Sequence, residues 1–433
     1  MLFVKSAPRD DLVILGARVV DPARSVDAVL DVRVDNGVIA QLGANVEANS
    51  HRVVDGSGLV LAPAFVDPHV HLRTPGREDE ESIASGTQAA AAGGFCAILA
   101  MPNTEPVVDS ASVLGALVER AQAEAEVPVG FLAAISKRSE GGELTEMGEL
   151  ADSGAAGFSD DGRPVVSPSL MRRALQYGAV AGRTIAVHCE EPTLSRSGQM
   201  HEGVVSAELG FTGYPSVAES VMVGRDMALA AYEGRAVHVL HVSARESVEA
   251  VRRAQADGVT ATAEVTPHHL VLTDEALRSL DPNVKMNPPL RSADDRQALL
   301  EALMDGTICA VATDHAPHAR HEKDVPFEEA PFGVTGLETA FSALYTHLVE
   351  PGVLPLATLL ERMSAGPARA YGLEAPRIEP GADANLVLLD TERTWRVTED
   401  GFRSRSANSW LLGRDLRGVV RMTVAAGRVV HEG

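Results

Sequence analysis

The sequence predicts an α/β fold, a parallel (β/α)8 barrel (TIM barrel) with a small β-sandwich domain built from both chain ends. Apolar strand candidates recur eight times through the middle of the chain, and helical stretches fill most intervals, which is typical of a closed barrel. Both ends instead carry short strands and tight turns. An open doubly wound sheet is the alternative for the middle, but no Gly-x-Gly-x-x-Gly turn follows an early strand.

The two chain ends share one pattern. Near the N-terminus, Asp35-Asn-Gly37 lies between apolar runs and is a strong hairpin signal. The short apolar runs of both ends are 12–15, 17–20, 31–34, 38–40, 384–389, 419–424 and 428–430. We expect residues 1–62 and 371–433 to pair into the small β domain, and residues 63–370 to form the barrel.

In the middle of the chain, apolar strand candidates alternate with helical stretches. The eight strand candidates are 64–71, 96–101, 129–135, 156–159, 184–188, 236–242, 260–265 and 308–313. Helical stretches rich in Ala, Leu, Glu and Arg are Ser110–Glu126, Pro168–Gly178, Val217–Tyr232, Ala244–Asp257 and Ala293–Met304. In a barrel of this kind the active site lies at the carboxyl ends of the strands.

Composition narrows the class of protein. The 433 residues carry a formal charge of −22, which disfavours nucleic acid or an anionic membrane as a partner because both would be repelled. Cys96, Cys189 and Cys309 form no Cys-x-x-Cys motif, so we expect free thiols in a reducing compartment. The N-terminus lacks the apolar run of a signal peptide, and no stretch is apolar enough to span a bilayer. We therefore expect a cytoplasmic protein.

The first strand of the barrel ends in His69-Val-His71, with Arg73 two residues further on. Side chains alternate along a strand, so positions 69, 71 and 73 share one face, with the two imidazoles about 7 Å apart along the strand. A lone His-x-His is more often a pair of surface histidines. Here it ends an apolar strand, and later strands also end in His or Asp, which favours a metal site.

Polar side chains that could meet at one rim follow most of the other strands: Asn103, Asp160 and Asp161, His188 and Glu190, His238 and His241, Asn287, Asp314 and His318. A set of four histidines and two aspartates drawn from these residues would exceed what one tetrahedral zinc takes, so two metals are the simpler interpretation. A donor set without cysteine is typical of catalytic zinc, and four imidazoles disfavour magnesium or calcium. A carboxylate that bridges two cations would come from the pair at 160 and 161.

These residues resemble the amidohydrolase superfamily, and specifically the bacterial dihydroorotase family with a bridging aspartate in place of a carbamylated lysine. The motifs that carry the resemblance are Asp67-Pro-His-Val-His-Leu-Arg73, Met101-Pro-Asn-Thr104, Phe158-Ser-Asp-Asp-Gly162, His188-Cys-Glu190, His238-Val-Leu-His-Val-Ser243, Lys285-Met-Asn-Pro-Pro-Leu-Arg291, Ala312-Thr-Asp-His-Ala-Pro-His318 and Pro380-Gly-Ala-Asp-Ala-Asn-Leu-Val-Leu388. They span most of the chain in the family's order.

The resemblance implies a ligand set for two zinc ions. One zinc would be held by His69, His71 and Asp314, and the other by His188 and His241. Asp161 would bridge them, because the family's bridging position is the second Asp of the pair. No lysine stands at the fourth strand, and the nearest, Lys137, is expected in solvent. His238 is expected to face away from His241 as a packed histidine, and His268 and His269 stay unassigned.

The resemblance also implies a reaction. The family's substrate contacts correspond to Arg73, Asn103, Asn287, His318, Phe332 and Gly333. The reaction would be the reversible hydrolysis of the ring amide of (S)-dihydroorotate to N-carbamoyl-L-aspartate, used as ring closure in pyrimidine biosynthesis. Asp314 would be the catalytic group that takes a proton from water and hands it to the ring nitrogen. Arg73 suits a substrate carboxylate because a guanidinium can grip it bidentately.

Two other functions compete with this one. A dihydropyrimidinase, hydantoinase or allantoinase would open a cyclic amide on the same scaffold, but Arg73, Asn103 and Asp161 together favour an acidic substrate. An inactive scaffold for aspartate carbamoyltransferase would have lost metal ligands, yet all six are present. A homodimer and a complex with aspartate carbamoyltransferase remain open as partners.

Overall fold

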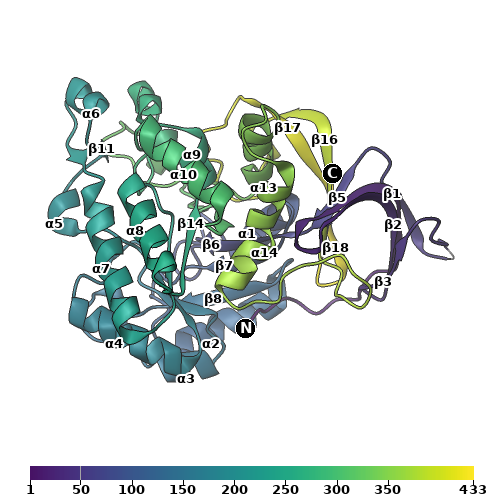
Figure 1. Cartoon of the computed structure of the whole chain (residues 1–433), viewed down its shortest axis with the longest axis horizontal. Coiled ribbons are helices and arrows are strands. Elements are labelled where there is room, and N and C mark those ends of the chain that lie inside the picture. The colour runs from purple at the N-terminus through teal and green to yellow at the C-terminus, as the bar shows by residue number, and fades with distance from the viewer. Residues whose placement is uncertain (49) are drawn as a thin grey trace.

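The structure is a computed structural model that describes residues 1–48 and 50–433. Two eight-stranded sheets dominate it, one from the middle of the chain and one from both ends. Figure 1 shows the helix-covered middle on the left and the curled sheet of the chain ends on the right. None of the helices in the described part combines the length and apolar character that a bilayer crossing requires.

The middle of the chain forms the predicted parallel barrel. Its strands are β6 (Phe65–Val70), β7 (Phe95–Ala100), β8 (Val129–Ala133), β9 (Gly157–Ser159), β10 (Thr184–Val187), β13 (Val237–Val239), β14 (Ala261–Val265) and β15 (Ala310–Val311). They are hydrogen-bonded in this order, and every neighbouring pair is parallel. All eight strand candidates of the sequence are therefore confirmed.

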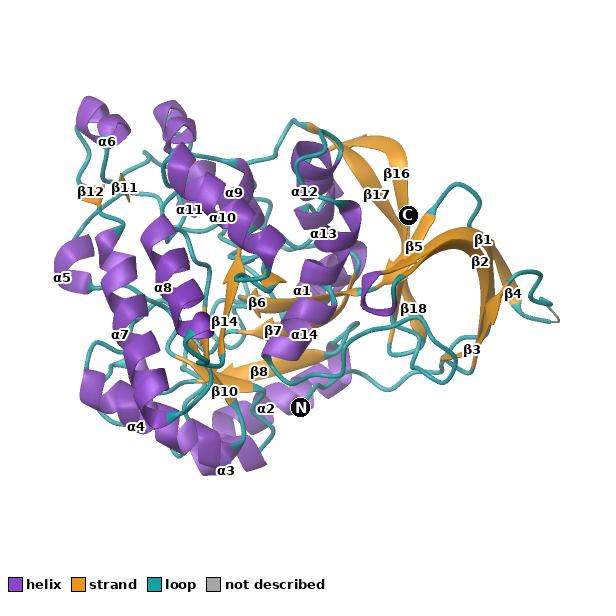
Figure 2. Cartoon of the chain, viewed as in Figure 1, coloured by secondary structure: helices purple, strands orange, loops and turns teal. Residues whose placement is uncertain are grey.

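Helices cover the outside of the barrel (Figure 2). The longer ones are α1 (Ile83–Ala92), α2 (Ala111–Glu124), α4 (Pro168–Ala181), α7 (Val217–Glu233), α8 (Arg245–Ala256), α10 (Ala293–Asp305) and α13 (Leu356–Met363). The shorter ones are α3 (Met147–Asp152), α5 (Pro192–Ser195), α6 (Val204–Leu209), α9 (Pro267–Val271), α11 (Arg320–Lys323), α12 (Ala340–Leu344) and α14 (Ala365–Ala370). The five helical stretches read from the sequence correspond to α2, α4, α7, α8 and α10.

The barrel closes between its first and last strands. Val70 pairs in parallel with His315, and the His71 N–H donates to the His315 carbonyl at 2.9 Å. Below this pair, the buried Asp67 carboxylate accepts from the Thr313 N–H at 3.1 Å and from the Thr313 hydroxyl at 2.5 Å. These contacts fix the end of β6 against the residues that follow β15, where further predicted site residues lie.

The chain ends build the second sheet. Its strands are β1 (Leu12–Asp21), β2 (Val26–Asp35), β3 (Val38–Gly43), β4 (Arg52–Asp55), β5 (Val60–Pro63), β16 (Leu386–Arg396), β17 (Asp415–Ala425) and β18 (Arg428–Glu432). They form one continuous sheet around a core of their own. Asn36 and Gly37 have φ values of 47° and 74°, as the predicted hairpin between β2 and β3 requires. The sheet curls until the Ile39 N–H donates to the Ala382 carbonyl at 2.9 Å.

Strand β5 joins the two parts. It pairs in parallel with β1 and antiparallel with β16, and the chain then runs directly into β6. The first residues of the chain leave the small domain, because Phe3 and Val129 of β8 exchange backbone hydrogen bonds of 2.8 Å. The division at 62/63 and 370/371 stays a prediction.

The structure predicts a stability effect at one close approach. A Cβ on Gly366 of α14 would lie 1.9 Å from the Cys309 carbonyl oxygen, beside β15. Gly366→Ala should therefore destabilise the protein by at least about 2 kcal/mol, because neither backbone can move freely. Gly115→Ala in α2, which has open space around it, is the control and should stabilise by about 0.5–1 kcal/mol. Urea denaturation measures both, and equal midpoints would contradict the close contact.

Candidate metal centre

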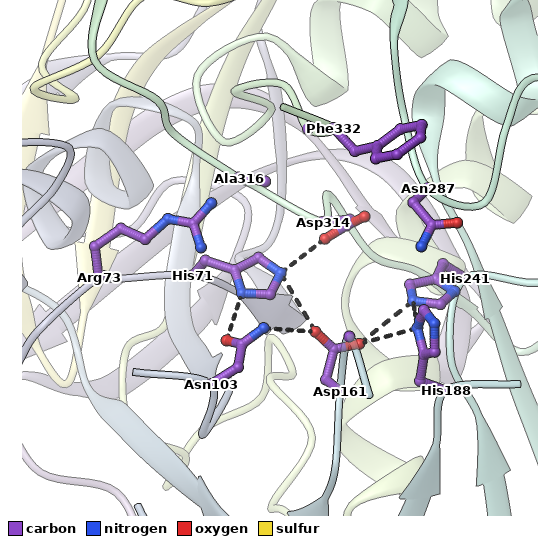
Figure 3. Close-up of a pocket in the computed structure, with 12 residues that line it drawn as sticks. His71, Arg73, Asn103, Asp161, His188, His241, Asn287, Asp314, Ala316 and Phe332 are labelled. Atoms are coloured by element: carbon purple, nitrogen blue, oxygen red, sulfur yellow. Dashed lines mark hydrogen bonds and ion pairs between the residues drawn. The ribbon is translucent and has the colours of Figure 1, made fainter. Parts of the chain in front are cut away.

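The predicted site residues converge at the carboxyl ends of the barrel strands, around a cavity of about 170 Å³ (Figure 3). The cavity is lined by His71, Arg73, Asn103, Asp161, Gly162, His188, His241, Asn287, Asp314, Ala316, Phe332 and Gly333. Ten of these residues are polar or glycine, as expected of a site for a small polar molecule. His69 lies beneath the cavity and is fully buried.

Asp161 stands between two pairs of histidines. Its Oδ2 lies 3.6 Å from Nε2 of both His69 and His71. Its Oδ1 lies 3.5 Å from Nδ1 of His188 and 3.4 Å from Nε2 of His241. One carboxylate thus offers a separate oxygen to each pair, which is the arrangement that a bridging ligand needs.

Asp314 joins the first pair only. Its Oδ1 lies 3.0 Å from His71 Nε2 and 3.4 Å from His69 Nε2. Asp314 follows Thr313, which Asp67 holds, and its φ of 48° turns the side chain toward the cavity beyond the strand end. The donors therefore fall into His69, His71 and Asp314 on one side and His188 and His241 on the other, with His69 also near enough to Asp161 and His241 to form a group with them.

The outer ring nitrogens of three histidines are already paired. His69 Nδ1 contacts Glu264 at 2.8 Å, His71 Nδ1 contacts the Asn103 side-chain oxygen at 3.0 Å, and His188 Nε2 contacts Glu190 at 3.2 Å. Each of these acceptors orients its ring, and in the neutral imidazole it favours the tautomer whose inner nitrogen can bind a metal ion. The inner atoms His69 Nε2 and Asp161 Oδ1 are buried without a hydrogen-bond partner. Nitrogen and oxygen donors oriented in this way fit divalent metal ions.

The charges of the cluster depend on one another. Burial by itself would raise the pKa of Asp161 and of Asp314, but the charge of His69, with the other histidines, holds both pKa values below the ordinary range. Burial lowers the pKa of His188, yet hydrogen bonds and charge from Asp161 and Glu190 raise it to about 9. The carboxylates therefore create a buried negative potential that a cation can neutralise.

The structure separates the two neighbouring aspartates. Asp160 turns away from the cluster and accepts from the N–H groups of Ile135 and Ser136 at 2.8 and 3.0 Å. Asp161 points into the cluster (Figure 3). The arrangement supports the choice of Asp161 as the bridge, and its role stays a prediction.

Glu264 is a site residue that the sequence analysis missed. It is fully buried in β14, and its oxygens contact His69 Nδ1 at 2.8 Å and His238 Nε2 at 2.9 Å. Burial would raise its pKa, but hydrogen bonds from His238 and His69 lower it to about 2. The only sequence signal was a charged residue in the apolar strand Ala261-Thr-Ala-Glu-Val265.

His238 is fully buried, as expected of a packed histidine, and its Nε2 contacts Glu264 at 2.9 Å. The alternation used to place it does not extend to residue 241, because β13 ends at Val239 and His241 has a φ of 29°. Glu264 Oε1 also accepts from the His241 N–H at 3.4 Å. His268 and His269 lie buried nearby, and His269 bonds the Pro288 carbonyl at 3.0 Å.

The chain matches the model of the amidohydrolase family over residues 60–430. The chain belongs to the amidohydrolase family. It is 46% identical over 423 residues to a dihydroorotase of Geobacter metallireducens, covering 98% of this chain and 100% of that protein. It is 48% identical over 426 residues to a dihydroorotase of Anaeromyxobacter dehalogenans, covering 98% of each. The chain is therefore an enzyme of the hydrolase class.

Solved amidohydrolase structures share the fold. An L-hydantoinase (dihydropyrimidinase) of Arthrobacter aurescens superposes with a TM-score of 0.88 at 27% identity, covering 98% of this chain and 96% of that one. A dihydropyrimidinase of Brevibacillus agri superposes with a TM-score of 0.84 at 23% identity, covering 98% and 95%. The chain therefore shares its overall fold with both enzymes.

Of the six predicted substrate contacts, five line the cavity of this amidohydrolase and His318 does not. Arg73 points its guanidinium toward His71 and Ala316 (Figure 3). Its Nε is held by Glu80 at 2.9 Å and by the Pro317 carbonyl at 3.1 Å, and its Nη2 lies 3.5 Å from His318 Nε2. Asn103, Asn287, Phe332 and Gly333 also line the cavity.

His318 does not line the central cavity. Its Nε2 donates to the Phe332 carbonyl at 2.8 Å, and it lines an adjoining wider cavity with Arg73 and Asn103. Glu80, His318 and Glu322 bring their donor atoms within 4.8 Å of one another. However, Arg77 pairs with both carboxylates at 2.8 Å, so this second group is already neutralised.

The metal prediction is tested at the aspartate pair. Asp161→Ala should sharply lower the metal content per chain, because both histidine pairs lose their shared carboxylate. Asp160→Asn is the matched control: it keeps a buried side chain of the same shape outside the cluster, so it should retain the metal content of the unmodified protein. Elemental analysis of the purified proteins measures both. Equal metal content in the two variants would remove Asp161 from the ligand set.

Proposed function

We propose that this amidohydrolase is a dihydroorotase that binds two zinc ions. The observation that carries the proposal is the guanidinium of Arg73 on the wall of a small cavity whose floor is the His/Asp cluster (Figure 3). A cationic group beside hydrolytic machinery suits a cyclic amide that also bears a carboxylate. Relatives named dihydroorotase, 43–48% identical over nearly the whole chain, support the same substrate.

The two groups of donors support two zinc ions, with His69, His71 and Asp314 for one, His188 and His241 for the other, and Asp161 shared. When bound, such ions supply Lewis-acid polarisation of the amide carbonyl and lower the pKa of water. The set of four imidazoles and two carboxylates, without thiolate, is typical of catalytic zinc.

The residues of the chain do the remaining work. Asp314 lines the cavity and presents a carboxylate oxygen that can accept a proton from the attacking water. It then returns this proton to the ring nitrogen as the C–N bond breaks, so the ring amide and one water give N-carbamoyl-L-aspartate. Ring closure follows the same path in reverse.

Arg73, Asn103 and Asn287 would hold the substrate. Asn103 also donates to Asp161 Oδ2 at 3.2 Å, so it links the substrate side to the proposed bridge. Asn287 Nδ2 donates to Glu190 at 3.1 Å, and its buried oxygen has no partner and is free to accept from a ligand. The contacts of His318, Phe332 and Gly333 with substrate, the cytoplasmic location, a homodimer and a complex with aspartate carbamoyltransferase stay predictions.

A dihydropyrimidinase or hydantoinase is the second candidate function, because such enzymes have the same fold. A spectrophotometric comparison of dihydroorotate with dihydrouracil, hydantoin and allantoin tests the choice. We expect turnover of dihydroorotate to dominate, and preferential turnover of a neutral ring would contradict the proposal.

Arg73→Ala should lower kcat/KM for dihydroorotate by about two decades while zinc stays bound, because it removes a charge-assisted grip on the carboxylate. Arg77→Ala is the control, since Arg77 also pairs with Glu80 but is half-exposed and lies outside the central cavity. Steady-state kinetics and zinc analysis measure both. Unchanged kcat/KM in Arg73→Ala would place the carboxylate elsewhere.

Asp314→Asn should keep most of the zinc and lose about 10²–10⁴-fold in kcat, the range usual for a lost general acid or base. The amide keeps the shape and an oxygen donor but cannot accept a proton at neutral pH. Hydrolysis and ring closure should fall by the same factor at a given pH, because the equilibrium constant is fixed. A zinc-replete variant with near-normal kcat would leave Asp314 as a ligand only.

A further inference from the structure

Segment 327–333 forms part of the cavity wall without regular helix or strand structure. It follows α11 and leads into Val334, which pairs with His315 at the rim of the barrel. Phe332 and Gly333, at its end, face the cavity. Backbone carbonyls outside helices and sheets need other hydrogen-bond donors when they are buried.

Side chains from three separate parts of the chain supply these donors. Six of the seven carbonyl oxygens from 327 to 333 accept from a side chain. The contacts are Lys285 Nζ to Phe327 at 2.7 Å, to Glu328 at 3.2 Å and to Ala330 at 2.7 Å, Lys323 Nζ to Pro331 at 2.7 Å, His318 Nε2 to Phe332 at 2.8 Å, and Asn408 Nδ2 to Gly333 at 3.2 Å. The conformation of the segment is therefore set from outside it.

Lys285 is the centre of this arrangement. Its ammonium group has three N–H donors and meets three carbonyl oxygens, a match that a planar guanidinium would not reproduce. The same ammonium lies 5.1 and 5.0 Å from the ring centres of Phe327 and Phe332, within range of a cation–π contact. The Lys285 carbonyl also accepts from the Gly333 N–H at 2.9 Å.

Lys323 adds a second tie. Its ammonium donates to the Pro282 carbonyl at 3.1 Å and to the Pro331 carbonyl at 2.7 Å, so it links the turn before Lys285 to the segment. Both lysines are buried, with exposures of 2% and 8%. Burial lowers the pKa of Lys285 to about 8, and burial with the charge of Lys285 lowers that of Lys323 to about 7.

Burying two ammonium groups carries an unfavourable desolvation free energy. The chain has four lysines. Two of them are buried beside segment 327–333, while Lys5 and Lys137 pair with carboxylates nearer the surface. An apolar side chain would fill the same space without the desolvation cost. What the ammonium groups add is a fixed path for the backbone that carries Phe332 and Gly333.

We propose that Lys285 and Lys323 are positioning residues, an ammonium clamp that holds segment 327–333 so that Phe332 and Gly333 face the substrate. The clamp rests on the proposed function only for the identity of that substrate. Without Lys285, the buried carbonyls of Phe327 and Ala330 and the partly buried carbonyl of Glu328 would lose their donor, and the Gly333 backbone would leave the cavity wall. Substrate and transition state would lose this contact alike, which raises KM and leaves kcat nearly unchanged.

Lys285→Met tests the clamp, because methionine keeps an unbranched apolar side chain against the two phenylalanine rings and removes all three donors. We expect KM for dihydroorotate to rise about tenfold or more with kcat within about threefold, and zinc content to stay unchanged. Amide hydrogen exchange in peptides that cover 327–333 should accelerate at least about tenfold, with barrel strands unaffected.

Lys137→Met is the matched control, since it removes an exposed ammonium paired only with Glu143, and it should change neither readout. Lys323→Met is the second variant and should show the same pattern, so the test still decides if Lys285→Met does not fold. Unchanged exchange in 327–333 in a folded variant, or faster exchange with unchanged KM, would overturn the clamp. If the unmodified enzyme does not turn over dihydroorotate, the proposed function is wrong. Amide hydrogen exchange of residues 327–333 in the lysine variants tests the clamp independently of the substrate.

Discussion

The buried carboxylate of Asp161 is the constraint on which the site depends. It lies among four imidazoles at the mouth of the barrel, and each of its oxygens faces a different histidine pair at 3.4–3.6 Å. A charge in this position is unfavourable unless cationic partners surround it. The outer contacts of three histidines with Glu264, Asn103 and Glu190 turn each of these rings so that its inner nitrogen faces the same space as the carboxylate. A metal ion held there would supply the cationic partner that the carboxylate requires.

The barrel supplies the precision that such a cluster needs. The donors stand at or just past strand ends, and the first and last strands are locked together by Asp67 with Thr313 and by His71 with His315. Donors from β6, β9, β10, β13 and β15 are distant in sequence but are fixed by one continuous ladder of parallel strands. A small displacement of one strand would move a donor out of reach, so closure of the barrel and assembly of the site are one structural event.

Much of the fold could be predicted because its signals are local. Apolar runs, helix periodicity and the Asp35-Asn-Gly37 turn each depend on a few neighbouring residues, and the eight barrel strands and five expected helices lie where those signals place them. In the small domain the expected runs 12–15 and 17–20 form the single strand β1, and β4 and β5 were not expected. The rule that strand ends share one rim predicted that polar residues at those ends would meet. The choice of His69, His71, Asp161, His188, His241 and Asp314 among them rested on the family resemblance. The contacts that were missed are long-range or lie beyond strand ends. Glu264 reaches His69 across 195 residues, and alternation fails at His241 because the strand has already ended.

The His/Asp cluster and the groups proposed to contact the substrate are held in different ways. The cluster lies at strand ends, whose positions are fixed by the ladder of parallel strands. The groups proposed to contact the substrate lie on loops, where no ladder fixes the backbone. These loops are held by side chains instead: Glu80 orients Arg73, Glu190 holds Asn287, and Lys285 carries the backbone before Phe332. The positions of the proposed substrate contacts therefore depend on side-chain partners outside the His/Asp cluster, whereas the cluster itself depends on the barrel strands.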